Sequence, residues 1–118
     1  MMGYMCHHAI IVTSCIEGLL DRALIQAQAI FEYVSPISKK AVNGYQSFFI
    51  PPDGSKEGWG ESDDGDERRQ HFIDWLTSQA FEDGSNSLTW IEVQYGDGDH
   101  DDKISRSYLD RLKEVRRA

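Results

Sequence analysis

The sequence predicts an α+β fold in which a four-stranded antiparallel sheet carries two helices on one face. Three observations lead to this prediction: a β-branched run followed by a helical apolar stripe (residues 7–35), an Asn-Gly link between two strand-like runs (residues 37–50), and a second helical stripe followed by an alternating run (residues 63–95). In chain order the elements read β-α-β-β-α-β, the ferredoxin-like pattern, and a C-terminal amphipathic helix follows. At 118 residues the chain suits a single domain, with the ferredoxin-like core over residues 6–96 and the last helix over residues 103–117.

The first strand and the first helix have the clearest signals. Residues 7–14, HHAIIVTS, form a β-branched run whose unbroken apolar centre predicts a central strand. Ser14 and Glu17 match the serine-x-x-glutamate capping box, so we expect a helix to begin there and to end before Pro36. Its buried stripe recurs at three- and four-residue spacing and consists of Ile16, Leu19, Leu20, Ala23, Leu24, Ala27, Ile30, Phe31 and Val34.

A β-hairpin is predicted next, with residues 37–42 paired to residues 45–50. The Asn-Gly pair between them suits the positive φ angles of a type I′ turn, and the lysines of the first strand are typical of a sheet edge. A helical turn over residues 38–42 is the alternative. Two prolines end the second strand, because proline cannot donate to a sheet ladder, and a glycine-rich loop follows.

The second half of the chain supplies a helix, a strand and a final helix. Asp63 or Asp64 caps a helix whose apolar stripe stops at Gly84. The strand over residues 88–95 alternates, with Thr89, Ile91, Val93 and Tyr95 on one face and Trp90, Glu92 and Gln94 on the other. Residues 103–117 read as an amphipathic helix. Because two helices cover only one face of a sheet, we expect a homodimer, or this last helix, to cover the other face.

Charge is segregated along the chain. Residues 61–102 contain 13 acidic side chains and two arginines, a net charge of −11, whereas residues 103–118 carry a net charge of +4. This distribution argues against direct nucleic-acid binding and suits a basic protein partner or a self-complementary oligomer; solvated loops are the simpler interpretation. A tryptophan between two glycines is either a core anchor or an exposed contact residue. The candidate interaction residues are therefore Trp59, Asp63, Asp64, Asp66, Asp97, Asp99 and Asp101.

The cysteines and the hydropathy bear on the compartment. Cys6 and Cys15 are the only cysteines, and they would lie at the two ends of one strand, roughly 30 Å apart by strand rise, so they cannot bridge each other. No stretch approaches the roughly 20 apolar residues of a membrane span, and the amino terminus lacks the features of a signal peptide. We therefore expect a cytoplasmic protein; the translation start at Met1, Met2 or Met5 is left open.

A metal site is the main alternative to an interaction surface. The candidate ligands are Cys6, His7 or His8, Asp99 and His100, whose side-chain types suit zinc. Adjacent strand histidines point to opposite faces, so only one of His7 and His8 can join a given ion. The spacing matches no zinc motif, and a calcium loop counted from Asp97 fails at the glycine and glutamate positions, so we expect neither metal nor cofactor.

Three segments of the chain resemble small uncharacterised proteins carried by tailed bacteriophages and prophages: residues 6–14 (CHHAIIVTS), 43–59 (NGYQSFFIPPDGSKEGW) and 90–97 (WIEVQYGD). The resemblance carries no catalytic motif and implies a small accessory protein that acts on a host factor or a defence system. The leading hypothesis is a protein that binds such a partner through acidic loops, which imitate the charge of nucleic acid. The alternatives are a small metal-dependent enzyme using His7 or His8, Asp99 and His100, and a purely structural, oligomerising protein.

Overall fold

The computed structural model describes residues 4–118, so the candidate translation starts at Met1 and Met2 lie outside the described residues. The elements are β1 His7–Ser14, α1 Leu19–Ile30, β2 Gln46–Ile50, α2 Gly60–Ser78, β3 Thr89–Tyr95, β4 Lys103–Ser107 and α3 Leu109–Arg117. The fold is therefore α+β, as predicted. The element order is β-α-β-α-β-β-α, so the predicted ferredoxin-like order is wrong. Among these residues, no helix has both the length and the apolarity that crossing a membrane requires.

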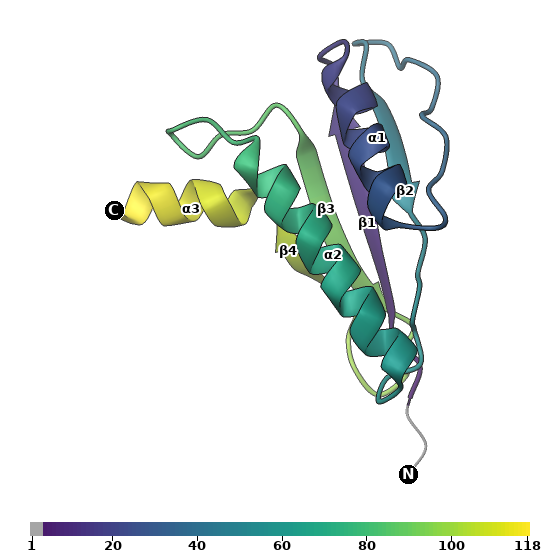
Figure 1. The fold of residues 1–118 in the computed structure, drawn as a ribbon. Coiled ribbons are helices and arrows are strands. Elements are labelled where there is room, and N and C mark those ends of the chain that lie inside the picture. The colour runs from purple at the N-terminus through teal and green to yellow at the C-terminus, as the bar shows by residue number, and fades with distance from the viewer. Residues whose placement is uncertain (1–3) are drawn as a thin grey trace.

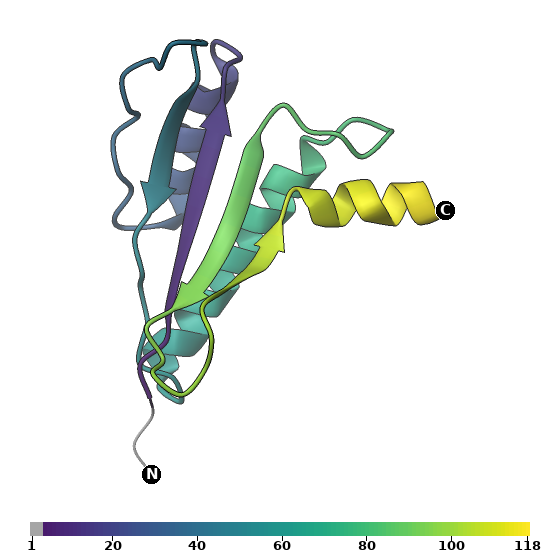
Figure 2. The ribbon, with the colours of Figure 1, turned by 180° about the vertical axis from the view of Figure 1, so that it is seen from behind.

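The four strands form one antiparallel sheet in the order β2-β1-β3-β4. The β1–β3 pairing is the longest and runs from His7 opposite Tyr95 to Thr13 opposite Thr89. Both α1 and α2 lie on one face of this sheet (Figure 1). Seen from behind, the opposite face carries no helix of the described residues 4–118 (Figure 2). We call these the covered face and the uncovered face.

The core lies between the covered face and the two helices. Alternate residues of β1 point into it, and Ile10 and Val12 are fully buried there. Small side chains of α1 let that helix approach the sheet closely, while α2 supplies the larger Phe72. The ring of Phe72 meets that of Phe31 edge-on at a centroid distance of 5.8 Å. The buried set is Ile10, Val12, Leu20, Ala23, Ala27, Phe31, Phe48, Ile50, Phe72, Ile73, Leu76, Leu88 and Trp90.

Both long helices begin away from their predicted caps. Ser14 stays in β1, where its hydroxyl accepts a hydrogen bond from the amide of Ile16, and α1 begins only after Gly18. Gly18 has a φ angle of 83°, a left-handed conformation that glycine adopts at little cost. The capping box therefore does not form. The second helix begins at Gly60, ahead of the predicted aspartate caps, and ends at Ser78.

Residues 37–42 do not form the predicted strand. This part of the chain runs beside β2, but two serines bond to β2 irregularly. The amide of Ser35 donates to the carbonyl of Phe49, and its hydroxyl accepts from the Phe49 amide. Ser38 makes the same two hydrogen bonds with the backbone of Ser47. The two serines are three positions apart in the chain, whereas their partners are two positions apart, so no regular ladder fits. The turn is also not type I′, because only Gly44 has a positive φ angle; nor does a helical turn form over residues 38–42.

The C-terminal segment is not one helix, because residues 103–107 form the fourth strand, β4. Glu92 of β3 is buried, and it accepts hydrogen bonds from Ser105 and Arg106 of β4. The chain then turns at Ser107, whose hydroxyl accepts the amide of Leu109, the first residue of α3. A helix over residues 103–107 would leave the Glu92 carboxylate without these partners.

The short helix α3 extends away from the sheet rather than across it (Figure 2). None of its residues is fully buried. Its nearest support is the loop after α2, where the backbone of Leu112 lies against Gly84. The expectation that the last helix covers the second face is therefore wrong, and no helix of residues 4–118 covers the uncovered face.

Candidate functional site

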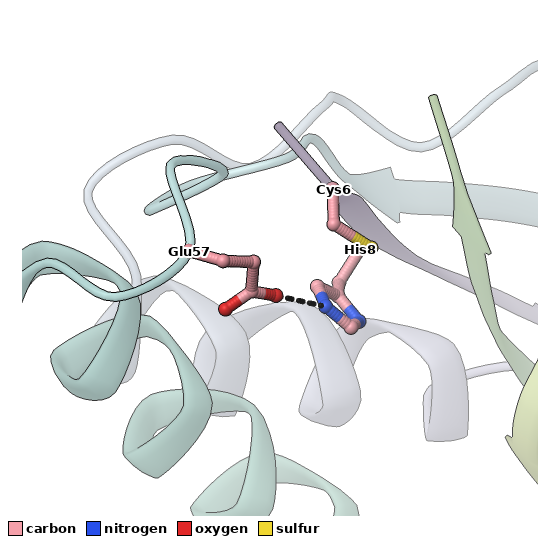
Figure 3. Close-up of side chains that lie close together, drawn as sticks. All are labelled: Cys6, His8 and Glu57. Atoms are coloured by element: carbon pink, nitrogen blue, oxygen red, sulfur yellow. Dashed lines mark hydrogen bonds and ion pairs between the residues drawn. The ribbon is translucent and has the colours of Figure 1, made fainter. Parts of the chain in front are cut away.

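The first residues of β1 and the loop before α2 meet at one end of the sheet. Cys6 and His8 are two residues apart on an extended chain, so their side chains leave the same side of it. The amide of Cys6 donates to the carbonyl of Ser55 at 2.8 Å, and the amide of Glu57 donates to the carbonyl of Tyr4 at 2.7 Å. These two bonds place the Glu57 side chain beside Cys6 and His8 (Figure 3).

Cys6, His8 and Glu57 form what we call the Cys-His-Glu cluster. One ligand atom from each residue, a sulfur, a ring nitrogen and a carboxylate oxygen, lies within 4.8 Å of the other two. Nε2 of His8 is 3.3 Å from Oε1 of Glu57. Oε2 of Glu57 accepts a hydrogen bond from the hydroxyl of Ser62 at 2.7 Å. Because Ser62 is buried in the first turn of α2, the helix holds the carboxylate in place.

The cluster is shielded on its cysteine side and accessible on its other side. Cys6 is 1% exposed, whereas the side chains of His8 and Glu57 are 15% and 23% exposed. Burial, followed by the nearby Glu57 carboxylate, raises the pKa of the Cys6 thiol. A thiol with a raised pKa is protonated at neutral pH and is a poor nucleophile. The geometry therefore does not favour nucleophilic catalysis by Cys6; the three donor atoms together are a set suited to a borderline-soft cation.

His7 points away from the cluster, as the alternation of a strand requires. Its Nδ1 lies 2.8 Å from the hydroxyl of Ser55, and its ring packs against Tyr95 at a centroid distance of 5.2 Å. Gly96 leaves room for this ring, because a Cβ there would clash with Cδ2 of His7. His7 is thus engaged in packing on the uncovered face, and only His8 joins the cluster.

Asp99 and His100 lie in the β3–β4 loop and bond within it. Nδ1 of His100 is 2.5 Å from Oδ2 of Asp97, and Oδ1 of Asp97 accepts the amide of Asp99 at 3.0 Å. The Asp99 amide is the main reason that the pKa of Asp97 lies below its usual value. Within residues 4–118, the Cys-His-Glu cluster is the only group of three potential ligands, so the set His8, Asp99 and His100 is not brought together.

A buried ionic network lies under α2 on the covered face. Nε of Arg106 donates to Oε1 of Glu92 at 2.8 Å, and Nε of Arg69 lies 3.7 Å from Oε2 of Glu92. Arg69 also donates to Asp66 and to the carbonyl of Asp53. Burial alone would raise the pKa of Glu92, but the hydrogen bonds from Arg106 and Ser105 outweigh burial and hold that pKa below its usual value. The network fixes β3, β4 and α2 together.

The predicted acidic residues lie at one end of the molecule. Asp63, Asp64 and Asp66 are exposed in the first turns of α2 rather than in a loop. The other predicted aspartates, at positions 97, 99 and 101, lie in the β3–β4 loop. Both views place these two segments at the same end of the sheet, where β1 begins (Figures 1 and 2). We call residues 61–67 and 97–102 the acidic end.

Trp59 directly precedes α2, with its backbone extended at a φ angle of −107°. Its side chain does not belong to the buried core, and the residue is 46% exposed. Nζ of Lys56 lies 4.2 Å from the centroid of its ring, a cation–π contact. Trp59 therefore lies on the surface beside the acidic end, packed against a lysine.

Sequence reasoning considered Cys6 and His8 but missed Glu57 and Ser62. The Cys-x-His alternation of an extended chain indicates two side chains on one side, and that signal was readable. Glu57 follows 49 residues later in a loop, where nothing local marks it as a neighbour of His8. Only the backbone pairing of that loop with residues 4–6 brings it there.

Comparisons of the chain with protein-family models, with curated proteins and with solved structures give no match. The fold and the site define an α+β protein with one uncovered sheet face, an acidic end and a Cys-His-Glu cluster beside it. Its function is therefore argued from these three features.

Proposed function

We propose that this chain is a small cytoplasmic accessory protein of bacteriophage type, which binds a basic host or defence protein through its acidic end. The observation that carries the proposal is the convergence of residues 61–67 and 97–102, which are 30 residues apart in sequence, at one end of the fold. Convergent carboxylates produce a concentrated negative potential, which steers and orients a positively charged partner. A protein that ordinarily binds nucleic acid has a positively charged surface of this kind.

Part of this charge has a structural role. Glu61 and Asp63 lie in the first turn of α2, where acidic side chains stabilise the helix dipole. Asp66 is bonded to the buried Arg69. The carboxylates without such roles include Asp64 and Glu67 on the exposed side of α2, so these two are the informative positions for a binding test.

The basic α3 supports a partner of opposite charge rather than nucleic acid. Its exposed basic residues, Arg111, Lys113, Arg116 and Arg117, form a small group that is far from the acidic end (Figure 2). Nucleic-acid binding requires a broad basic surface, which a net charge of −8 does not provide. Both cysteines are free thiols, which fits the proposed cytoplasmic location.

The test is differential capture from a bacterial lysate. Wild-type protein, the double reversal Asp64→Lys/Glu67→Lys, and the control reversal Glu17→Lys/Glu32→Lys serve as baits; the control changes the same charge at exposed sites near α1. We expect a protein captured by the wild type and the control but lost with the first reversal. The association rate of this protein with the wild-type bait should fall several-fold between low and physiological salt, because salt shortens the range of the electrostatic attraction. Equal capture by all three baits would contradict the proposal.

A second copy of this chain is the occupant we propose for the uncovered face. A shallow apolar groove of about 660 Å³ lies there, over β1, β2, β3 and the segment beside β2, lined in part by Ile11, Pro36 and Phe49. The segregation of charge favours self-association, since an antiparallel pair would bring the basic α3 of one copy toward the acidic end of the other. Light scattering should give twice the chain mass for the wild type and the chain mass for Phe49→Asp. A wild-type monomer at high concentration would contradict it.

A further inference from the structure

The Cys-His-Glu cluster supports an inference that does not depend on the acidic end having a partner. We propose that Cys6, His8 and Glu57 together bind a zinc ion, through Sγ, Nε2 and a carboxylate oxygen, and that the Cys6 thiol releases its proton to water as the metal binds. The donor set favours zinc over calcium and magnesium. Thiolate, imidazole and carboxylate are the ligands of protein-bound zinc, whereas calcium and magnesium prefer oxygen atoms alone.

The distance between the His8 and Glu57 donor atoms already fits a tetrahedral ion. Zinc bonds of roughly 2.0–2.3 Å place neighbouring ligand atoms roughly 3.3–3.8 Å apart. The Nε2 atom of His8 and the Oε1 atom of Glu57 are already 3.3 Å apart. One ligand atom from each of the three residues lies within 4.8 Å of the other two, a separation that side-chain rotation can shorten to the spacing of zinc ligands. Figure 3 shows the three side chains converging from two segments.

The surroundings hold these ligands in place, as functional metal sites require. Ser62 donates to the Glu57 oxygen that does not face His8, so that carboxylate has a fixed orientation. His8 lies in β1, opposite Gln94 in the β1–β3 pairing. The amide of Cys6 is bonded to Ser55. Each ligand therefore has its own support within the fold.

The position of the cluster favours a cation. The hydrogen bond from Ser62, which lies within residues 61–67, joins Glu57 to the acidic end, whose carboxylates raise the local concentration of positive ions. Three protein ligands leave the fourth zinc position open, and the partial exposure of His8 and Glu57 lets water or a partner side chain reach it. The bound ion would connect the start of β1 to the loop before α2, the two segments that build this end of the molecule.

The test uses the tag-free full-length chain, with zinc and cobalt as probes. After metal removal and reloading, elemental analysis should find one zinc per chain, and cobalt should give a thiolate charge-transfer band. The variants Cys6→Ser, His8→Asn and Glu57→Gln should each lose stoichiometric zinc. The matched controls Cys15→Ser, His71→Asn and Glu67→Gln change exposed residues of the same types and should keep it.

Two further readouts separate binding from folding. Ser62→Ala keeps all three ligands and should weaken zinc affinity roughly 10- to 100-fold, as loss of a ligand's supporting hydrogen bond does. Zinc should raise the Tm of the wild type by several degrees, whereas magnesium should not, because only a bound ligand shifts the folding equilibrium. Absence of stoichiometric zinc and of the cobalt band in the folded wild type would overturn the proposal. So would retention of zinc by the Cys6 and His8 variants.

Discussion

Phe48 and Phe49 are adjacent in β2, yet Phe48 is 2% exposed on the covered face and Phe49 is 45% exposed on the uncovered face. The same contrast separates Ile10 from Ile11 in β1. Apolar residues occupy both faces of this sheet, so composition alone does not tell which face forms the core. The two helices decide it: side chains beneath them stabilise the fold, and those on the other face are available for an interface.

The largest expected effect comes from the covered face. Phe48→Ala should lower the free energy of unfolding by about 3–5 kcal/mol, since it removes a buried ring and leaves a cavity beneath the helices. Urea denaturation at neutral pH measures this change. A loss below about 1 kcal/mol would show that the covered face does not hold the core.

The buried Glu92 should have the next largest effect, and it depends on pH. Glu92→Gln should cost about 2–3 kcal/mol at pH 7, less than breaking an isolated buried pair, because Arg69 keeps its bonds to Asp66 and Asp53. Since the pKa of Glu92 is lower in the folded chain than its ordinary value, its contribution is present above the ordinary glutamate range. This stabilisation is lost as the pH falls through the pKa that Glu92 has in the folded chain.

Urea denaturation of the wild type and Glu92→Gln across pH 3–7 measures this dependence. The two stability curves should differ most at neutral pH and approach each other in acid. A constant difference across the whole range would mean that the carboxylate charge is not what stabilises β4 against β3.

The smallest expected effect comes from the uncovered face. Phe49→Ala should change the free energy of unfolding by less than about 1 kcal/mol under dilute conditions where the chain is monomeric, because the side chain is half exposed already. Measuring Phe48→Ala and Phe49→Ala in one series compares the two faces directly. Equal losses at the two positions would remove the distinction between them.

The parts of the fold that could be predicted are those with local signals. The β-branched run of residues 7–14 is β1, as predicted, and the two faces predicted for β3 are the two faces observed. Burial separates them: Trp90 and Glu92 are buried, while Tyr95 is exposed on the opposite face. A strand needs only its own alternation to be recognised, since that alternation reflects the two environments on either side of it.

The errors arose where distant residues decide the structure. Residues 103–117 have a helical apolar stripe, but the first five residues form β4 because Ser105 and Arg106 satisfy a buried carboxylate on β3. Residues 37–42 resemble an edge strand, but the spacing of Ser35 and Ser38 does not match that of their partners. Glu57 likewise joins the Cys-His-Glu cluster only through backbone bonds between distant segments. No local pattern encodes such partners.

The irregular segment beside β2 limits how copies of this chain can aggregate. Pro36 and two lysines occupy it, and its serine hydroxyls take the place of carbonyl acceptors, so it offers no regular row of hydrogen-bonding groups to an incoming strand. On the other side, β4 ends the sheet order of the described residues with no strand beyond it. Two copies that joined through β4 would have both outer edges occupied by the irregular segment. Fibril growth needs two open edges per copy, so sheet extension through β4 would stop at a pair.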